Sequence, residues 1–554
     1  MPSHGSNDDG DISRRPLLKG LGAAGLIGLA GCISEEGDVE ADNAAEELIA
    51  EGFEEEGVEP PFETTVYANS DSSDRIAYGE LIQNELNETG FFDVSFDDME
   101  WGAYLDFMNS VAEEEENALL CNGHSADWDP HVFMNNPYHS SAHSPSGINT
   151  NHFEDEEYDD LVDEGVEESD QEARQDIYAD AQERLVELSP VALIQFGEQV
   201  TAWNNDEVSG FKTHPMAGRE FTAVYAPHEG VYTEVDNDDD ELRVDLGSDV
   251  PDFDPISQED TVSLMATTLV YESLIAVDFA GTPQPGLATD WEQEDDTTWR
   301  FYLREGVEFH NGDEFTAHDV QTSYERYEDE VRESDVYDWY ESSEIVNDHE
   351  IVIEHHRDYS GPFEATGAGD VPIVPEGAED GDVNLSDGPV GTGPYQFDEH
   401  QEDDRFVIER YDDHWYTGDE YDNDVPETPP VETIVMEVIP EGSSRHQALE
   451  VGDIDLSQGL PAESVAEFED DDDFDVDGAL GLSNEYLTFP LWQEPFNNPK
   501  VRRGISGLIP RETIMDNVFH DVGELAYTPI SPILEDFTGT DYQDELAEEH
   551  LEVQ

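Results

Sequence analysis

Three histidines in one short stretch offer the most suggestive metal-binding pattern of this chain. His139, His143 and His152 lie among acidic side chains, and imidazole and carboxylate groups are zinc ligands. The i, i+4 spacing of His139 and His143 would bring both rings together only on a helix. The segment "YHSSAHSPSG" is typical of a loop instead. We therefore expect no metal site and no cofactor.

Catalytic motifs are missing from the sequence. It contains no Gly-x-Ser-x-Gly, no His-Glu-x-x-His and no Walker motif. Paired carboxylates cannot be singled out, because 139 of the 554 residues are acidic. We therefore expect a protein that is not an enzyme. A secreted metal-dependent hydrolase is the unfavoured alternative, and zinc content after dialysis would separate the two classes.

The charge balance is extreme, since 139 Asp and Glu face 21 Lys and Arg, for a net charge of −118. The acids are spread evenly and accompany 8 Trp, 22 Tyr and 25 Phe, which favours a folded chain with an acidic surface over a disordered acidic tail. Such a surface repels itself unless salt screens it, and at 1 M salt the Debye length is about 3 Å. The composition predicts an extreme halophile. It excludes nucleic acid as a partner, because no basic patch can neutralise phosphates.

The first 32 residues are typical of an export signal. Arg14 and Arg15 precede an apolar run over residues 17–30, which as a helix would be about 21 Å long and too short for a bilayer core of about 30 Å. The paired arginines resemble a twin-arginine signal, and "LAGC" resembles a lipobox with Cys32 as the lipidated residue. Residues 33–44 then form an acidic tether. Cys121 is the second of only two cysteines, so no disulfide framework is expected.

Regular elements are clearest after residue 241. Residues 242–246 alternate as a strand, and residues 299–303 place three apolar side chains on one strand face. "TVSLMATTLVYESLIAVD" has helical spacing. Thr316 and Asp319 form the pattern of a helix cap, followed by an apolar helical face. Residues 229–241 are acidic and poor in apolar residues, which predicts a linker.

A family resemblance begins in this half of the chain. "YESLIAVDFAGTPQPGLATDWEQEDDTTWRFYLREGVEFHNGDEFTAHDVQTSYERY" resembles the N-terminal lobe of the family 5 extracellular solute-binding proteins, the oligopeptide- and dipeptide-type receptors of ABC importers. "GPVGTGPYQF", "ERYDDHWY" and "EYLTFPLWQEPFNNPKVRRGISGLIPRETI" follow in the order of that family. The resemblance implies an α/β fold of the periplasmic-binding-protein type, class II and cluster C, with two lobes, a hinge and a ligand cleft.

The front of the chain resembles the rest of the same family. "AEELIAEGFEEEGV" and "CNGHSADWDPHVFM" are similar to segments of its second lobe. The chain therefore resembles a circularly permuted member. Residues 45–228 would match the C-terminal part, with the second lobe and the return strand, and 229–241 would join the old ends. Residues 242–482 would form the first lobe, and 483–554 would cross into the second. A rearranged gene product is the alternative.

The resemblance also implies a binding site. In the peptide-binding branch an aspartate meets the ligand's α-amino group, and Asp127 matches it in "SADWD". Trp128 would form a wall of the pocket. Other residues expected beside the ligand are Gly123, His124 and Ser125, which match a backbone strand, and Asn484 and Tyr486 in "SNEYLTF".

The expected function is that of a lipid-anchored receptor at the extracellular face of the cytoplasmic membrane. It would bind a peptide or another small solute and deliver it to the permease subunits of an ABC importer. Backbone pairing can bind peptides without reading their sequence. A nickel complex, haem or an oligosaccharide stays open as the solute, because the fold alone does not decide the ligand.

Overall fold

The computed structural model describes residues 41–551 except residues 42, 71, 169, 238–239, 259, 296, 329, 331, 333–335, 338, 357–367, 379–380, 382, 419 and 422. The expected signal, with Arg14, Arg15 and Cys32, lies outside the described residues, and so does most of the expected tether. Residues 39–554 group into one unit by their contacts. The fold below is that of this unit.

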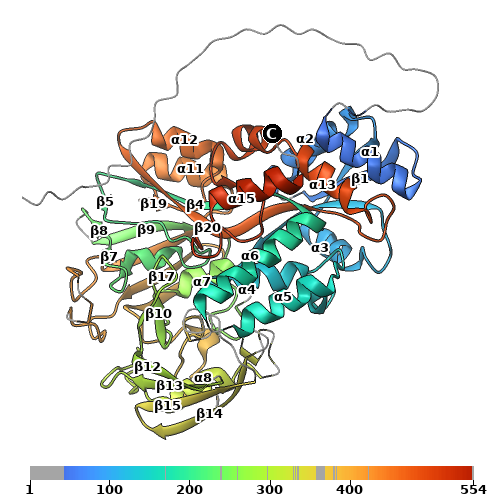
Figure 1. Ribbon diagram of the computed structural model, residues 1–554. Helices are drawn as coiled ribbons and strands as arrows, with labels where there is room; N and C mark the ends of the chain where they lie inside the picture. The colour runs from blue at the N-terminus through green and yellow to red at the C-terminus, as the bar shows by residue number, and fades with distance from the viewer. Residues whose placement is uncertain are drawn as a thin grey trace, which may run out of the picture. The chain divides into compact units, whose positions relative to one another are not determined.

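Two long antiparallel strands connect the two lobes of the unit. They are β4 (Val191–Asn204) and β20 (Phe474–Thr488). Both run through the middle of a sheet that has eleven strands among the described residues, in the order β16-β17-β18-β9-β19-β4-β20-β3-β1-β2, with β21 (Glu524–Leu525) on β4. The first five strands belong to one lobe and the last three to the other. Figure 1 shows β20 passing from the side of β19 toward α13.

The first lobe is built on β9 (Glu241–Leu246). Its residues Leu242, Val244 and Leu246 are buried, which confirms the predicted alternation. β9 pairs in parallel with β18 and β19. The other main elements of this lobe are β16 (Tyr395–Gln401), β17 (Arg405–Arg410), β18 (Thr433–Val438), β19 (Leu456–Ser457), α11 (Gly442–Val451) and α12 (Ala462–Glu469).

A separate four-stranded sheet extends the first lobe. Its strands are β12 (Ala288–Asp295), β13 (Thr298–Leu303), β15 (Glu350–His355) and β14 (Tyr340–Asn347), in that order. The inward side chains of β13 are buried, as predicted. The helix α8 (Ala317–Glu325) packs against this sheet, and Thr316 and Asp319 form the predicted capping box at its start.

The helix expected from residue 261 is shorter than its pattern suggests. α7 (Thr261–Thr267) ends where the carbonyl groups of Leu269 and Val270 accept hydrogen bonds from the N–H groups of Tyr395 and Gly393. A Cβ on Gly393 would lie 2.3 Å from the Leu269 oxygen. Position 393 of the Gly-Thr-Gly-Pro-Tyr segment therefore requires glycine, because two backbones approach each other closely there.

The second lobe encloses its sheet between two sets of helices. β1 (Phe62–Asn69) pairs in parallel with β2 (Phe92–Met99) and β3 (Ala118–Ser125), and β3 pairs antiparallel with β20. One face packs against α1 (Ala44–Glu56), α2 (Ser73–Glu88), α13 (Pro499–Leu508) and α14 (Arg511–Ile514). The other packs against α4 (Pro130–Tyr138), α5 (Glu156–Glu167) and α6 (Gln171–Leu188). α3 (Trp101–Ser110) packs against β3, and α15 (Thr540–Leu546) packs beside α6.

Short strands occupy the region expected to be a linker. β7 (Val231–Tyr232) pairs with β6 (Tyr225–Ala226), and β8 (Glu234–Val235) pairs with β5 (Val208–Ser209). Val231–Tyr232 and Glu234–Val235 are thus hydrogen-bonded to the segment that precedes them. The remaining elements are β10 (Ile275–Val277), β11 (Pro283–Pro285), η1 (Ser140–Ala142), η2 (Glu220–Val224), η3 (Glu376–Ala378), η4 (Leu385–Asp387), η5 (Met515–Phe519) and η6 (Ala547–Leu551).

Segments from opposite ends of the sequence complete the second lobe together. α1 packs along α13, which Figure 1 shows in blue beside orange-red. A Cβ on Gly507 would lie 2.2 Å from the Leu551 oxygen and 3.3 Å from the Ala45 Cβ. The first and last described helices therefore meet at one point.

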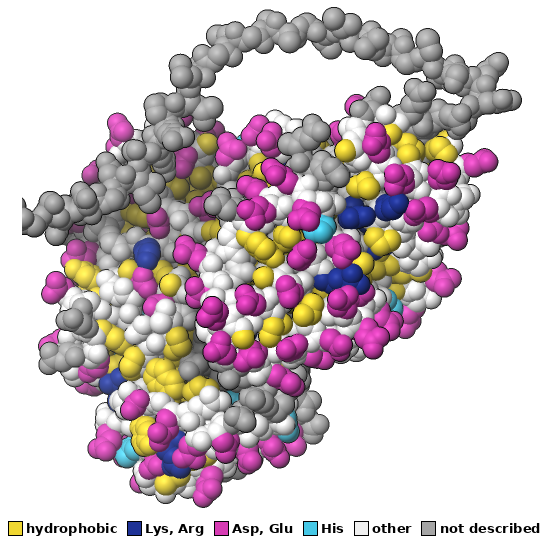
Figure 2. All heavy atoms as spheres, viewed as in Figure 1, with side chains coloured by type: hydrophobic (Ala, Val, Ile, Leu, Met, Phe, Trp, Pro, Cys, Tyr) yellow, Lys and Arg dark blue, Asp and Glu magenta, His cyan; other side chains and the backbone are white. Residues whose placement is uncertain are grey.

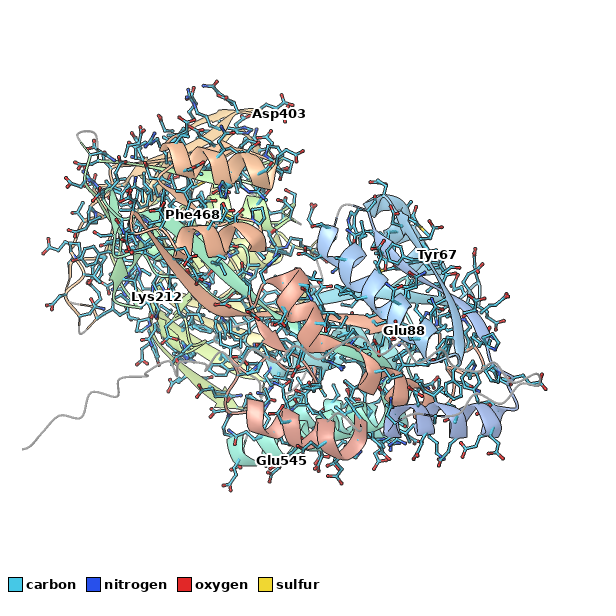
Figure 3. The ribbon with its side chains drawn as sticks, turned by 90° about the horizontal axis from the view of Figure 1, so that it is seen from above. Tyr67, Glu88, Lys212, Asp403, Phe468 and Glu545 are labelled. Carbon is cyan, nitrogen blue, oxygen red and sulfur yellow. The ribbon has the colours of Figure 1, made fainter. Side chains whose placement is uncertain are left out.

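The surface is acidic throughout the face shown in Figure 2. The exposed acids Glu88, Asp403 and Glu545 come from three distant parts of the chain (Figure 3). Among the residues that the structure describes, no helix has the length and apolar character that crossing a bilayer requires.

Candidate ligand-binding cleft

Two adjoining cavities lie between the lobes. The larger has a volume of about 480 Å³ and the smaller about 130 Å³. The second lobe contributes residues after β3 and from α4, and the first lobe contributes the opposite wall. The two cavities share the lining residues Met216, Arg219, Thr268, Tyr271, Ser273 and Asp370. Pockets of this combined size accept small molecules.

Asp127 is the acid of the second lobe that faces the larger cavity. It follows β3 and precedes α4, and its Oδ1 accepts a hydrogen bond of 2.7 Å from the N–H of Asp129. Burial raises the pKa of the Asp127 carboxyl well above its ordinary value, and the charges of Asp129 and Asp370 raise it further. A cation placed beside Asp127 would reverse this effect.

Asp129, two residues later, has a different role. It caps α4 by accepting a hydrogen bond of 2.9 Å from the N–H of His131. Its carboxylate also pairs with Arg174 of α6 at 2.7 Å, and the two side chains are 0% and 3% exposed. Burial alone would raise the pKa of Asp129, but Arg174 and the hydrogen bonds lower it overall. Asp129 is therefore a structural anchor that fixes the turn carrying Asp127.

The smaller cavity is largely aromatic. Trp128, Tyr271, Trp415 and Tyr421 contribute to its lining. Trp128 also joins the lobes, because a Cβ on Gly281 of the first lobe would lie only 2.7 Å from its indole ring. This cavity can hold an apolar or aromatic group.

Glu272 lines this smaller cavity together with the second acid Asp370. It accepts hydrogen bonds from Trp415 Nε1 at 2.8 Å and from Thr392 Oγ1 at 2.8 Å, and His414 Nε2 lies 3.2 Å away. Burial acts to raise the pKa of Glu272, but His414 and these donors outweigh it and lower the pKa. Glu272 is thus satisfied within the protein, in contrast to Asp127.

The larger cavity also holds basic side chains of the first lobe. Arg219 pairs with Asp370 at 2.8 Å, and both side chains are about a third exposed. Arg332 donates a hydrogen bond of 3.0 Å to the carbonyl of Pro255. The cavity therefore presents an acid from one lobe and basic groups from the other, an arrangement that suits a ligand with both charges.

A family model matches just under half of the chain. It is described as "Bacterial extracellular solute-binding proteins, family 5 Middle", and it matches residues 282–553. Residues 282–553 are similar to this family. Family 5 consists of binding proteins and not of enzymes. The matched stretch includes the cleft residues Asp370 and Trp415 of the first lobe but not Asp127.

Individual proteins match over a similar share. The glutathione-binding protein GsiB of Escherichia coli O1:K1 / APEC is 24% identical over 284 residues, which are 50% of this chain and 54% of that relative. This chain thus spans about half the length of the curated relatives it matches. The DppA protein of Helicobacter pylori, solved with the peptide STSA, is 22% identical with a TM-score of 0.41, over 56% of this chain and 66% of DppA. NikA of Brucella suis, solved with Fe(III)-EDTA, is 25% identical with a TM-score of 0.35, over 41% and 46%.

The structure places some residues predicted from family 5 in the cleft. Asp127 and Ser125 line the larger cavity, and Trp128 lines the smaller one. Ser125 is the last residue of β3, and Asp127 and Trp128 follow it before α4 begins. The three residues belong to one sequence motif, "SADWD", and its resemblance to family 5 made this prediction possible.

The other four predicted residues do not line either cavity. Gly123 packs on the ion pair of Arg75 and Glu485, because a Cβ there would lie 2.5 Å from a Glu485 oxygen. His124 is buried, with Nε2 3.2 Å from the Val132 carbonyl. Asn484 and Tyr486 are buried in the second lobe, where Asn484 donates to the Pro529 carbonyl at 2.8 Å.

The three histidines considered for zinc are part of a loop and a 3₁₀ turn. His143 Nε2 lies 3.0 Å from the Phe153 carbonyl, and His152 Nε2 lies 2.9 Å from the Ser144 carbonyl. His139 begins η1 and contacts Ser141. In the part of the chain that the structure describes, no group of three or more His, Cys, Asp or Glu is arranged to hold a metal ion.

Sequence reasoning missed the first-lobe wall. Arg219, Asp370, Tyr271 and Glu272 line the cleft, but none of them was predicted as a binding residue. Tyr271 and Glu272 begin the quoted segment "YESLIAVD". Trp415 lies in the quoted segment "ERYDDHWY" and could have been identified there. The acidic side chains of Asp370 and Glu272 did not indicate a binding role, because each is one of 139 acids in the chain.

Proposed function

We propose that this chain is the substrate-binding component of an ABC importer and that it binds peptides by their α-amino group. Asp127 is the observation that carries the proposal. It is an acid at a cleft between lobes, and its pKa is raised by burial and by neighbouring acids. An ammonium group would supply the missing counter-charge, since a buried charge is costly when unpaired.

The surrounding residues fit the rest of a peptide. Ser125, at the end of β3, would lie beside the ligand backbone. Trp128 and the aromatic cavity would hold an apolar side chain near the amino end. Arg219 and Arg332 would face the carboxylate end. Closure would bend β4 and β20, the strands that join the lobes, and would trap the ligand.

Other solutes remain the second candidate within the same receptor function. The similar proteins include a glutathione-binding protein and a protein solved with an iron chelate. A nickel complex, haem or an oligosaccharide would use the same cleft with different contacts. The aromatic cavity favours a ligand with a ring or an apolar part, and Asp127 favours one with a cationic nitrogen. Glutathione satisfies the second condition.

The proposal includes the location of the protein. The export signal ending at Cys32 would place a lipid anchor in the membrane, with the described unit on the extracellular side. There the receptor would meet the permease subunits. The Cys32→Ser variant should lack the lipid, and the mass of the mature protein compared with the wild type measures this.

We also propose that the family order is circularly permuted. The packing of α1 along α13, and the meeting of Ala45 and Leu551 at Gly507, support this proposal. A chain rebuilt as residues 242–551 followed directly by 45–228 should then fold and bind the same ligand. Failure of the rebuilt chain to melt cooperatively in molar salt would count against the permutation.

The first experiment identifies the ligand. The mature chain is purified in molar salt and denatured, and the released small molecules are analysed by mass spectrometry. Released peptides would support the proposal. A sugar, haem or metal chelate would replace peptide as the solute. An empty protein without a cooperative melting transition would point to a rearranged gene product.

The second experiment tests the amine anchor. Calorimetric titration compares a bound peptide with its N-acetylated form, which has no ammonium group. Acetylation and Asp127→Asn should each weaken binding by about 100-fold, because each leaves one buried charge unpaired. Asp106→Asn, an exposed acid on α3, is the matched control and should change nothing. Equal affinity for both peptides would remove Asp127 from this role.

A further inference from the structure

Two arginines are buried in the second lobe away from any acid. Arg502 of α13 and Arg511 of α14 are each 4% exposed. Among the described residues, neither guanidinium forms an ion pair. Arg502 donates its hydrogen bonds to the carbonyls of Leu188, Ser189 and Phe496. This is unexpected in a chain with 139 acids, because buried charges are normally paired.

Arg511 is incompletely satisfied. Its Nε donates to the Leu193 carbonyl at 2.8 Å, and its Nη1 donates to the Ser506 carbonyl at 2.6 Å. The ring of Tyr527 lies 4.8 Å from its guanidinium carbon. Its Nη2 is buried and has no hydrogen-bond partner among the described residues. An unmet donor on a buried cation is among the costliest defects of a protein interior.

A small cavity adjoins this guanidinium. Arg511, Ser189, Ser506 and Tyr527 line it on the polar side, and its volume is about 10 Å³. The apolar lining is formed by Leu185, Val186, Pro190, Val191, Leu193 and Leu551. The volume is close to that of one water-sized sphere. A peptide, a carboxylate side chain of a ligand or a phosphate does not fit.

The hydroxyl groups at the cavity can add a second donor. Ser189 Oγ and Ser506 Oγ lie 2.9 Å apart, and Ser189 Oγ can also donate to the Val191 carbonyl at 3.3 Å. When Ser189 donates to Ser506, the Ser506 hydrogen is available to an occupant. The cavity thus offers N–H and O–H donors and a positive charge.

Electrostatics favour a negative occupant. Burial lowers the pKa of Arg511 to about 10 and that of Arg502 to about 9, so both remain charged at neutral pH. The acids that act on the neighbouring Tyr527 are Asp544 and Glu512, and both are exposed. Arg511 is therefore a buried cation that has no ion pair among the described residues.

We propose that the cavity beside Arg511 binds a single small inorganic anion of the halide class, chloride in a saline medium. The anion would accept hydrogen bonds from Arg511 Nη2 and from a serine hydroxyl. It would connect α14 to the turn after α6 and to the start of β4, the return strand between the lobes. This site is separate from the cleft, and the inference does not rest on the proposed function.

The test varies chloride at constant total potassium. Potassium glutamate is replaced by potassium chloride, because glutamate is too large for the cavity. Unfolding of the wild-type chain and of Arg511→Met is followed in both salts. Once chloride saturates the site, each tenfold rise in free chloride should lower the wild-type unfolding equilibrium constant about tenfold relative to Arg511→Met. Arg410→Met, a surface arginine paired with Asp412, is the matched charge control and should follow the wild type.

A second measurement uses the wild-type protein and tests the site even if Arg511→Met does not fold. Crystals of the wild-type protein grown in bromide should show an anomalous scattering peak within hydrogen-bond distance of Arg511 Nη2. Equal chloride dependence in wild type and Arg511→Met, or an ordered water without anomalous signal at this position, would overturn the proposal.

Discussion

The cleft and the interior of the second lobe contain opposite kinds of unbalanced charge. In the cleft, Asp127 lines the larger cavity and has no ion-pair partner among the described residues, and its pKa is raised. In the interior, Arg511 is buried without an acid, and its pKa is lowered. In contrast to both residues, Asp129 and Arg174 form a buried ion pair with each other. Our two proposals therefore depend on the presence or absence of an internal partner and not on the type of residue.

Breaking this buried ion pair should have the largest effect. Arg174→Met leaves Asp129 buried without its cation, so the free energy of unfolding should fall by about 3–5 kcal/mol. The pKa of Asp129 is lowered in the folded wild type, so its stabilisation is present above the unfolded value of about 3.9 and is lost as pH falls through the folded value. Denaturant unfolding in molar salt measures this. A loss below about 0.5 kcal/mol would mean that the pair has no structural role.

Removing the charge of Asp127 should not lower the free energy of unfolding, in contrast to Arg174→Met. The pKa of Asp127 is raised on folding, so the charged form costs stability above the unfolded value of about 3.9. Asp127→Asn should therefore unfold at the same or a higher denaturant concentration than the wild type at pH 7, although it binds peptide more weakly. The wild-type affinity should fall on acidification through the raised pKa, while the variant shows no such step. Strong destabilisation of the ligand-free variant would place Asp127 with Asp129 as a structural residue.

The sequence predicted the local elements well and the cleft only in part. Alternation identified β9, and the Thr316 and Asp319 pattern identified the start of α8, because both depend on neighbours in the sequence. Asp127 was predicted from the residues around it. Arg219 and Asp370 could not be predicted, since their pairing joins residues far apart in the chain.

Two further discrepancies have a physical cause in long-range contacts. α7 ends early because the following carbonyls bond to the segment around Gly393, and no local pattern encodes that partner. The sequence pattern of Arg511 is that of an ordinary helix residue, and only the tertiary structure shows that it has no ion pair among the described residues. The twin-arginine, lipidation and halophile assignments stay predictions.

The next prediction concerns His124, which is buried close to the segment that carries Asp127. Burial lowers the pKa of His124 to about 4 from an ordinary 6.5. The unfolded chain therefore binds more protons between these values, and stability should fall as pH decreases from about 6.5 to 4. The contribution of His124 is at most roughly 3 kcal/mol. His124→Asn should show a shallower loss over this range than the wild type, measured by denaturant unfolding at each pH. Equal slopes would mean that His124 is solvated or charged in the fold.

The smallest expected effect concerns the contact between the lobes. Gly281 has φ +79° and lies against Trp128, whereas Gly312 has φ +85° and no atom within 4 Å of its Cβ position. Alanine at either position should cost about 1 kcal/mol of stability, because both demand the left-handed region. Only Gly281→Ala should also push the indole of Trp128 and weaken ligand binding several-fold. If both variants bind the ligand equally well, Trp128 is a core residue of the second lobe and not a wall of the cleft, and Asp127 alone would then define the amino-end site.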